Sequence, residues 1–117
     1  MTIIGKYRGE IHQSSYFCRM LGIKTRAVKV AEALEKGALI VDVRTPQEYS
    51  DGHIKNSINI PLQQMDSRIA MLKKKNKVVI TCCRSGARSG RACSILKKNG
   101  IECVNGGGWG NLNYLLH

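Results

Sequence analysis

Short apolar runs alternate with amphipathic stretches along the chain from residue 24 onward. Four of these runs have the length of β-strands: residues 38–43, 58–60, 78–82 and 101–104. The first run is apolar at nearly every position, as expected of a strand whose two faces are both buried. Strands that alternate with helices at this spacing predict an α/β domain with a mostly parallel sheet.

Helix signals fill the intervals between the runs. Thr25 is a candidate N-cap for a helix that Gly37 would end. Thr45, Pro46 and Glu48 have the spacing of a capping box with proline in the first helical turn. The expected helices cover about 26–36, begin at Pro46, begin at Asp66, run from Ser85 or Ser89 to Lys98, and cover 112–116.

The first 23 residues show no sustained helical or strand period. They are compatible with an added strand pair, a partner-binding arm or a disordered segment, and the sequence leaves these alternatives open. A chain of 117 residues has the size of one domain. We therefore divide it into an N-terminal extension of uncertain structure, residues 1–23, and one folded domain, residues 24–117.

Positive charge dominates the composition, with 19 Lys and Arg against 8 Asp and Glu and a formal net charge of +11. No acidic residue occurs from Ser67 through Ile101, a stretch rich in lysine and arginine. The positive field over this stretch would draw anionic substrates toward it. The same field would suit nucleic acid, but the stretch lacks interleaved aromatic residues for base stacking. We therefore expect no nucleic-acid partner.

Neither a membrane segment nor a structural metal site is indicated. No apolar run approaches the ~18 residues of a membrane span, and the N-terminus lacks the apolar region of a secretory signal. We expect no membrane partner and a cytoplasmic location. The five cysteines are an odd number without a C-x-x-C pair, which argues against a disulfide framework and a zinc site. We expect no metal, and we interpret Cys93 and Cys103 as small buried apolar residues in a reducing compartment.

The segment from 78 to 91 combines an apolar strand, a cysteine and a small-residue loop that leads into a helix. Cys83 follows the strand 78–82 directly, and Arg84 and Arg88 stand on both sides of the small-residue loop that comes after it. A helix N-terminus and neighbouring cations both lower the pKa of a thiol, so Cys83 is predicted to ionise near neutral pH. The carboxyl end of a strand is also where parallel α/β sheets bind ligands. Cys83 is therefore the candidate nucleophile, in a site that attracts anions.

Four motifs, taken together and in order, resemble those of the rhodanese family of sulfurtransferases. They are Leu39–Tyr49 with its Asp-Val-Arg sequence, Gly52–Pro61 with Gly-His-Ile and Asn-Ile-Pro, the loop Cys83–Ser89, and the closing Gly106–Trp109. The resemblance covers roughly residues 24 to 113. One departure is Asn56-Ser57, where Gly-Ala is common in the family; asparagine tolerates a positive φ, so the turn is expected to survive.

The resemblance implies a rhodanese-like three-layer domain with a central, mostly parallel five-stranded sheet flanked by helices. It implies a sulfurtransferase in which the Cys83 thiolate takes a sulfane sulfur from a small anionic donor such as thiosulfate, or from a persulfide. The Cys83 persulfide would then pass that sulfur to cyanide or a thiol, with no cofactor beyond this covalent intermediate. The donor would be bound by the loop residues Arg84, Ser85, Gly86, Ala87, Arg88 and Ser89.

The two arginines are the expected contacts of the donor's oxyanion end, because guanidinium groups match oxyanion geometry. Arg88 has a second interpretation, in which it bonds loop carbonyls and only stabilises the loop. Cys-based phosphatases are a nearby alternative, but they place five residues between Cys and Arg, whereas four separate Cys83 from Arg88. No acidic residue lies near the loop in the sequence to serve as their general acid.

Two further functions remain open beside sulfur transfer between small molecules. One is a persulfide carrier in a protein sulfur relay, with the partner docked on the basic face. The other is a non-catalytic interaction or sensing module, although a purely binding role has no need of an activated thiol.

Several other residues in the motifs are interpreted as structural. Asp42 and Arg44 either pair with each other or hold the loop, His53 lies at a helix end, and Trp109 packs near the rim of the site. Cys82 either resolves the persulfide or points into the sheet. Because neighbouring strand residues face opposite sides, we predict that it is silent.

Overall fold

The computed structural model of the chain describes Gly22 and residues 24–117. The sequence interpretations of the N-terminal extension, residues 1–23, therefore lie almost wholly outside the described residues. The elements in chain order are α2 (Arg26–Glu35), β1 (Leu39–Asp42), α3 (Pro46–Ser50), β2 (Ile58–Asn59), the 3₁₀ turn η2 (Leu62–Gln64), α4 (Met65–Lys75), β3 (Val79–Cys83), α5 (Ala87–Lys98), β4 (Cys103–Gly108) and α6 (Trp109–Leu115).

The sheet of the described residues has four strands in the order β2-β1-β3-β4, and every pairing is parallel. The expected α/β class and parallel sheet are confirmed. The five strands implied by the family resemblance are corrected to four within 24–117. The physical reason is that this part of the chain has only four extended apolar runs, and the segment before β1 is the helix α2.

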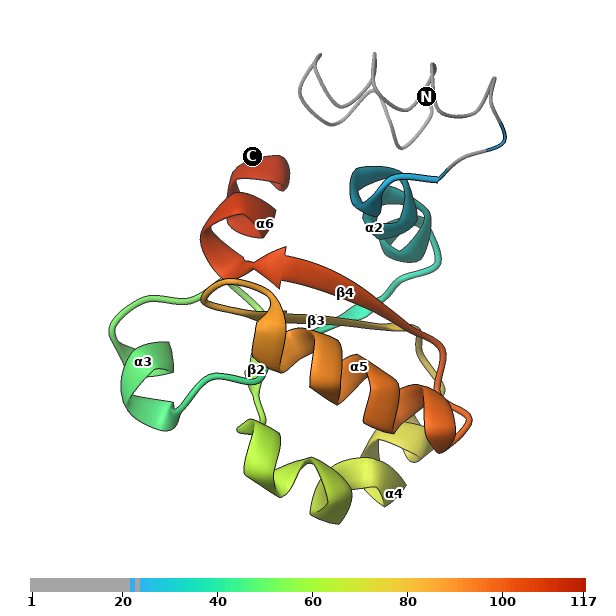
Figure 1. The fold of residues 1–117 in the computed structure, drawn as a ribbon, viewed down its shortest axis with the longest axis vertical. Coiled ribbons are helices and arrows are strands. Elements are labelled where there is room, and N and C mark those ends of the chain that lie inside the picture. Colours follow the sequence, from blue (N-terminus) through green and yellow to red (C-terminus); the bar gives the residue numbers. More distant parts are fainter. Residues whose placement is uncertain (1–21, 23) are drawn as a thin grey trace.

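Helices cover both faces of the sheet, which gives three layers. In Figure 1, α2 and α6 lie over one face, and α4 and α5 lie over the other. The side chains of β3 alternate between two hydrophobic clusters. Val79 and Cys83 pack with the cluster that includes Leu72 of α4 and Leu96 of α5. Ile80 and Cys82 pack with the cluster of α2 and α6 on the opposite face.

Polar caps fix the helix starts that the sequence predicts. The Thr45 side chain accepts a hydrogen bond from the backbone N–H of Glu48, and the Glu48 side chain accepts one from Thr45 N–H, which completes the capping box. Thr25 Oγ1 likewise accepts from Val28 N–H at the start of α2. The helix α5 differs, because its N-cap is Gly86 and it has no side-chain cap.

The last strand departs from its predicted bounds. It begins at Cys103 and continues through the glycine-rich segment to Gly108, whereas the apolar pattern placed it at 101–104. Between the pairs Thr81–Asn105 and Cys83–Gly108, β4 uses one more residue than β3, which is a β-bulge. Apolar patterning misses this extension because glycines without side chains form its buried surface.

No helix among residues 24–117 is long and apolar enough to cross a membrane.

The bulged strand makes a stability prediction. A Cβ at Gly106 would lie 2.8 Å from both Ile80 Cγ2 and the backbone oxygen of Thr81. Because that oxygen belongs to the central strand, we expect Gly106→Ala to lower the free energy of unfolding by about 1–3 kcal/mol. A Cβ at Gly110, in the helix α6, meets nothing within 4 Å, so Gly110→Ala should raise it by about 0.5–1 kcal/mol. Urea unfolding midpoints of the two variants compare them directly, and equal midpoints would contradict the prediction.

Candidate active site

Cys83 is the last residue of β3, at the carboxyl end of the central strand. The sequence placed it directly after the strand, and the structure extends the strand by one residue to include it. The side chain is fully buried and packs in the core cluster on the α5 side of the sheet. The nucleophile predicted from the sequence therefore lies at the edge of the sheet where parallel α/β folds bind ligands.

Hydrogen-bond donors converge on the Cys83 sulfur. Gly86 N–H donates to Sγ at 3.0 Å, and Ser89 N–H donates to it at 3.4 Å. The Ser89 hydroxyl lies 3.4 Å from Sγ. Burial raises the pKa of Cys83, but the bonds from Ser89, Gly86 and Ser85 outweigh that effect and bring the pKa below that of an ordinary thiol. The loop thus stabilises a sulfur anion mainly through neutral N–H and O–H groups.

Gly86 gives the loop the shape that this arrangement requires. Its φ is +105°, a conformation that side chains disfavour, and an added Cβ would lie 3.4 Å from Gly107 Cα of β4. The turn places Gly86 N–H against the sulfur and starts α5 one residue later. The helix N-terminus and the Cys83 sulfur are thereby brought together, as the sequence predicted.

Asn105 of β4 holds the loop from the neighbouring strand. Its Oδ1 accepts bonds from the Ser89 hydroxyl at 2.7 Å and from Gly107 N–H at 2.9 Å. Its Nδ2 donates to Gly86 O at 3.2 Å. Asn105 is not among the site residues predicted from the sequence. Its place near the carboxyl end of the strand beside β3 is the signal that could have found it.

The Ser89 hydroxyl has two acceptors for one proton. In the structure it donates to Asn105 Oδ1, and the same oxygen lies within contact of Cys83 Sγ. A hydroxyl has a single proton, so donating to Asn105 and donating to the sulfur are alternatives. Ionisation of Cys83 favours donation of the Ser89 proton to the sulfur. Asn105 Oδ1 then still accepts the bond from Gly107 N–H. The backbone of Ser89 is fixed independently, because Thr81 Oγ1 donates to Ser89 O at 3.0 Å.

The remaining loop residues face solvent to different degrees. Arg84, Ser85 and Ala87 are exposed, whereas Arg88 is half-buried. The Arg88 guanidinium forms a forked pair with Glu48 of α3, at 2.7 Å and 3.0 Å. Arg88 was predicted to bind the donor or loop carbonyls, whereas its partner in the structure is Glu48, 40 positions away and not predicted from the sequence.

Glu48 remains an anion over the working pH range. The Arg88 guanidinium, with help from bonds at Thr45, lowers the pKa of Glu48 to about 2. Glu48 in turn raises the pKa of Arg88, and a Cys83 thiolate raises it further. An acidic residue does therefore reach the loop through the fold, but it is ionised and cannot donate a proton as a phosphatase's general acid must.

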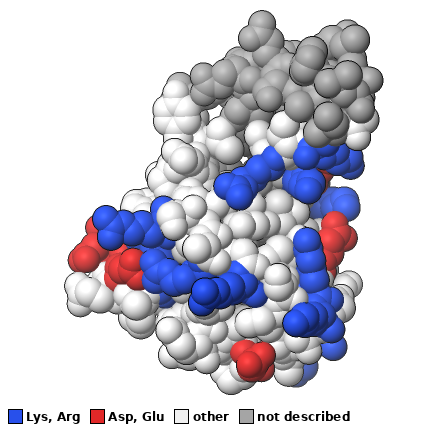
Figure 2. Space-filling model, viewed as in Figure 1, with Lys and Arg blue, Asp and Glu red and all other residues white. Residues whose placement is uncertain are grey.

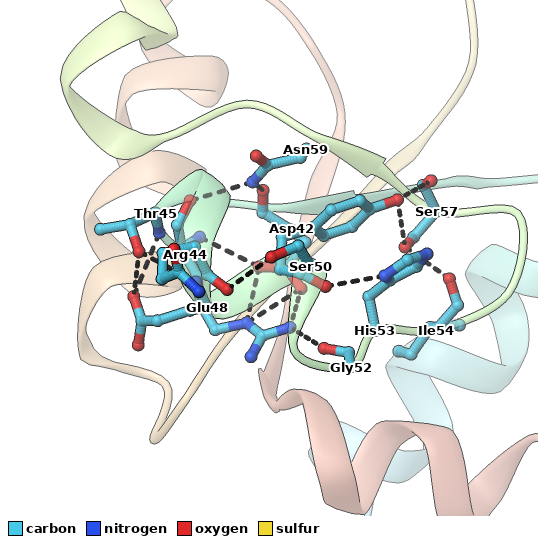
Figure 3. Close-up of polar contacts among 12 residues, drawn as sticks. Asp42, Arg44, Thr45, Glu48, Ser50, Gly52, His53, Ile54, Ser57 and Asn59 are labelled. Atoms are coloured by element: carbon cyan, nitrogen blue, oxygen red, sulfur yellow. Dashed lines mark hydrogen bonds and ion pairs between the residues drawn. The ribbon is translucent and has the colours of Figure 1, made fainter.

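A buried ion pair at the end of β1 positions α3 and its Glu48 (Figure 3). Arg44 Nε lies 3.0 Å from both Asp42 carboxylate oxygens, and Arg44 Nη2 lies 2.7 Å from Oδ2. The same Nη2 donates to Gly52 O at 2.7 Å. The Trp109 ring covers the guanidinium at 4.6 Å, and Gly52 leaves room for that ring. Of the two interpretations made from the sequence, mutual pairing is the one observed.

The other motif residues make local contacts. Asn59 Nδ2 donates to Asp42 O and Arg44 O, which ties β2 to the ion pair. His53 stacks on the Tyr49 ring, and its Nδ1 lies 2.8 Å from Tyr49 O at the end of α3 (Figure 3). Cys82 lies on the opposite face of the sheet from Cys83, as strand alternation predicts, and burial raises its pKa to about 12. Within residues 24–117, no three His, Cys, Asp or Glu side chains are grouped to hold a metal ion.

The Ser89 hydroxyl makes a prediction about the reactivity of Cys83. Ser89→Ala removes one bond that lowers the pKa of Cys83, so that pKa should rise. The rate of Cys83 alkylation by iodoacetamide, followed by peptide mass across pH, should then fall at neutral pH and shift its profile upward. Ser94→Ala is the matched control on the same helix, because the exposed Ser94 donates only to Gly90 O. A profile unchanged from wild type would show that the hydroxyl does not stabilise the thiolate.

Comparison with known proteins agrees with this geometry. The family model described as "Rhodanese-like domain" matches residues 26–111. The chain is 39% identical over 69 residues to "Thiosulfate sulfurtransferase PspE" of Escherichia coli, covering 58% of this chain and 66% of that protein. It is 31% identical over 97 residues to "Putative sulfur carrier protein YrkF" of Bacillus subtilis, covering 83% of this chain and 52% of that protein.

Solved structures give the same result. The structure titled "rhodanese with anions from E. coli" superposes with a TM-score of 0.59 at 37% identity, covering 63% of this chain and 89% of that chain. The family match spans all four motifs and the whole four-stranded sheet, and it ends within the last helix, α6. The chain belongs to the rhodanese-like domain family.

Proposed function

We propose that this protein is a sulfurtransferase that moves a sulfane sulfur through a persulfide on Cys83. The observation that carries the proposal is the buried Cys83 sulfur, which accepts bonds from the N–H groups of Gly86 and Ser89 and has a lowered pKa. Such donors stabilise an anion at a fixed point, as an oxyanion hole does. The name of the E. coli relative, a thiosulfate sulfurtransferase, supports the same reaction class.

The proposed cycle has two displacements at sulfur. The Cys83 thiolate attacks the outer sulfur of thiosulfate, forms a new S–S bond, and releases sulfite with the electron pair of the broken bond. A thiolate or cyanide then attacks the terminal sulfur of the Cys83 persulfide. The acceptor leaves with that sulfur as a small persulfide or as thiocyanate, and the Cys83 thiolate is restored. No proton transfer is needed in either displacement, so a general acid or base has no task.

The loop residues would bind the donor. Arg84 is exposed beside Cys83. Arg88 already shares both of its terminal nitrogens with Glu48, so a donor anion competes with that carboxylate for it. The sulfonate end of the donor would also contact the other loop residues, which are Ser85, Gly86, Ala87 and Ser89.

A sulfur carrier that serves a partner protein is the second candidate. Figure 2 shows that basic side chains gather over α5, which begins at the Cys83 loop. This helix contains no acidic residue, and its Arg91, Lys97 and Lys98 are exposed. An acidic partner could dock there with its thiol near Cys83. The name of the Bacillus subtilis relative, a putative sulfur carrier protein, is in keeping with this alternative.

The first test is the intact mass of the reduced protein after incubation with thiosulfate. Wild type should gain one sulfur atom, Cys83→Ser should gain none, and Cys82→Ser should gain it as wild type does. Steady-state rates with cyanide should follow ping-pong kinetics. If wild type gains no sulfur from thiosulfate or from a low-molecular-weight persulfide, the enzymatic proposal fails. Sulfur gain with slow transfer to cyanide but fast transfer to a protein thiol would favour the carrier.

The Glu48–Arg88 pair makes a separate prediction for donor binding. Glu48→Gln removes the anion that competes for Arg88, so the KM for thiosulfate should fall by roughly two- to five-fold. Glu102→Gln is the matched control, because it also removes one carboxylate from a surface ion pair. Glu102 pairs with Lys36 and lies just before the start of β4, at the opposite end of that strand from the Cys83 loop. Its KM should equal that of wild type. An unchanged KM in Glu48→Gln would show that Arg88 does not contact the donor.

A further inference from the structure

A second pair of thiols lies outside the Cys83 loop. Cys93 of α5 and Cys103 at the start of β4 belong to the same buried cluster of side chains. Each is 4% exposed, as the sequence analysis expected of buried residues. Both also line one cavity of about 410 Å³ between α2, α5 and β4. The pair therefore has an opening toward solvent that a cysteine in the centre of the core lacks.

The cavity is lined by positive charge. Arg26 and Lys29 reach it from α2, and Lys97 reaches it from α5. No acidic residue belongs to its lining. In Figure 2, which shares its orientation with Figure 1, basic side chains lie over the face between α2 and α5. Neither Cys83 nor residues 84–89 line the cavity, although Asn105, which holds the Cys83 loop, also lines it.

The two thiols are not equivalent. The interaction with the Cys103 thiol lowers the pKa of Cys93, burial opposes that effect, and the charge of Lys97 adds to it. The same interaction and burial raise the pKa of Cys103. Cys93 is thus the thiol that ionises first, and Cys103 stays protonated beside it. A low-pKa cysteine that lines a cavity beside a second thiol is the arrangement of redox-active cysteine pairs.

We propose that Cys93 and Cys103 form a second thiol site, which reacts with anionic low-molecular-weight disulfides, those that carry carboxylates near the S–S bond. Arg26, Lys29 and Lys97 would attract the carboxylates, and the cavity would admit the disulfide to Cys93. The site depends on sulfur atoms other than that of Cys83, so it stands whether or not the proposed sulfur transfer is correct.

The reaction has two thiol–disulfide exchanges. The Cys93 thiolate attacks one sulfur of the disulfide RSSR, forms a mixed disulfide, and releases RS⁻. Cys103, after losing its proton to solvent, attacks the Cys93 sulfur and releases the second RS⁻. The two thiols are oxidised to a Cys93–Cys103 disulfide, and one RSSR is reduced to two RSH. The disulfide itself is the oxidant, so no other reactant is required.

The experiment uses the full chain with Cys83→Ser, which removes the candidate nucleophile from the reaction. The reduced protein is incubated at neutral pH with oxidised glutathione, which is anionic, or with the same concentration of cystamine, which is cationic. Modification is followed site by site by non-reducing peptide mass mapping. Cys93 should react several-fold faster with oxidised glutathione than with cystamine, and the product should be the Cys93–Cys103 disulfide. Cys82, which is fully buried on the other face of the sheet, is the internal control.

Two further variants distinguish the roles of the residues. Cys103→Ser should stop the reaction at the mixed disulfide on Cys93, because no second thiol can resolve it. Lys97→Gln, an exposed change, should slow the reaction with oxidised glutathione and leave that with cystamine unslowed. Unfolding midpoints equal to that of the parent establish that each variant is folded. The proposal is overturned if Cys93 reacts no faster than Cys82, or if the two disulfides react at equal rates in the parent protein.

Discussion

The hydrogen bonds to the Cys83 sulfur are the interaction on which the local structure depends. A sulfur buried at the end of β3 would resist ionisation unless donors replaced water around it. The positive φ of Gly86, the start of α5 and the approach of β4 to the loop all serve to aim N–H groups at that atom. Asn105 fixes this shape from the adjacent strand by bonding Ser89 and Gly86 at once. The parallel order of β3 and β4 is what brings Asn105 to the same edge as Cys83.

The buried Asp42–Arg44 pair performs the corresponding task for α3. Removing two charges from water is costly, and here the Asp42 carboxylate and the Arg44 guanidinium are matched by several short bonds to each other and to the backbone. Their geometry ties β1 to the segment at Gly52 and provides a base for the Trp109 ring. The short helix α3 buries no residue fully, so its placement rests on these polar contacts and on its capping box. That placement brings Glu48 to Arg88.

Local signals in the sequence predicted most of the fold, and contacts between distant residues account for what was missed. The caps at Thr25 and Thr45 and the thiol at the end of an apolar strand depend on neighbours within a few positions, so pattern and spacing suffice. Glu48 and Asn105 reach the loop only through the topology of the sheet, and no local pattern identifies them. Cys93 and Cys103 were predicted to be small buried apolar residues, and both are buried. The cations around them come from α2 and α5, which the sequence does not bring together.

Charge at the loop separates sulfur transfer from phosphate-ester hydrolysis more sharply than loop length does. A phosphatase must protonate its leaving group, whereas sulfite and a thiolate leave sulfur as stable anions. The carboxylate nearest to Arg88 is that of Glu48, and its pKa of about 2 keeps it ionised. Glu48 is therefore a fixed negative charge in a basic surface, and in the proposed sulfur transfer it would weaken the binding of an anionic donor by Arg88. In that proposal, the weakened hold would let the sulfite product leave before the acceptor enters, as the two displacements require.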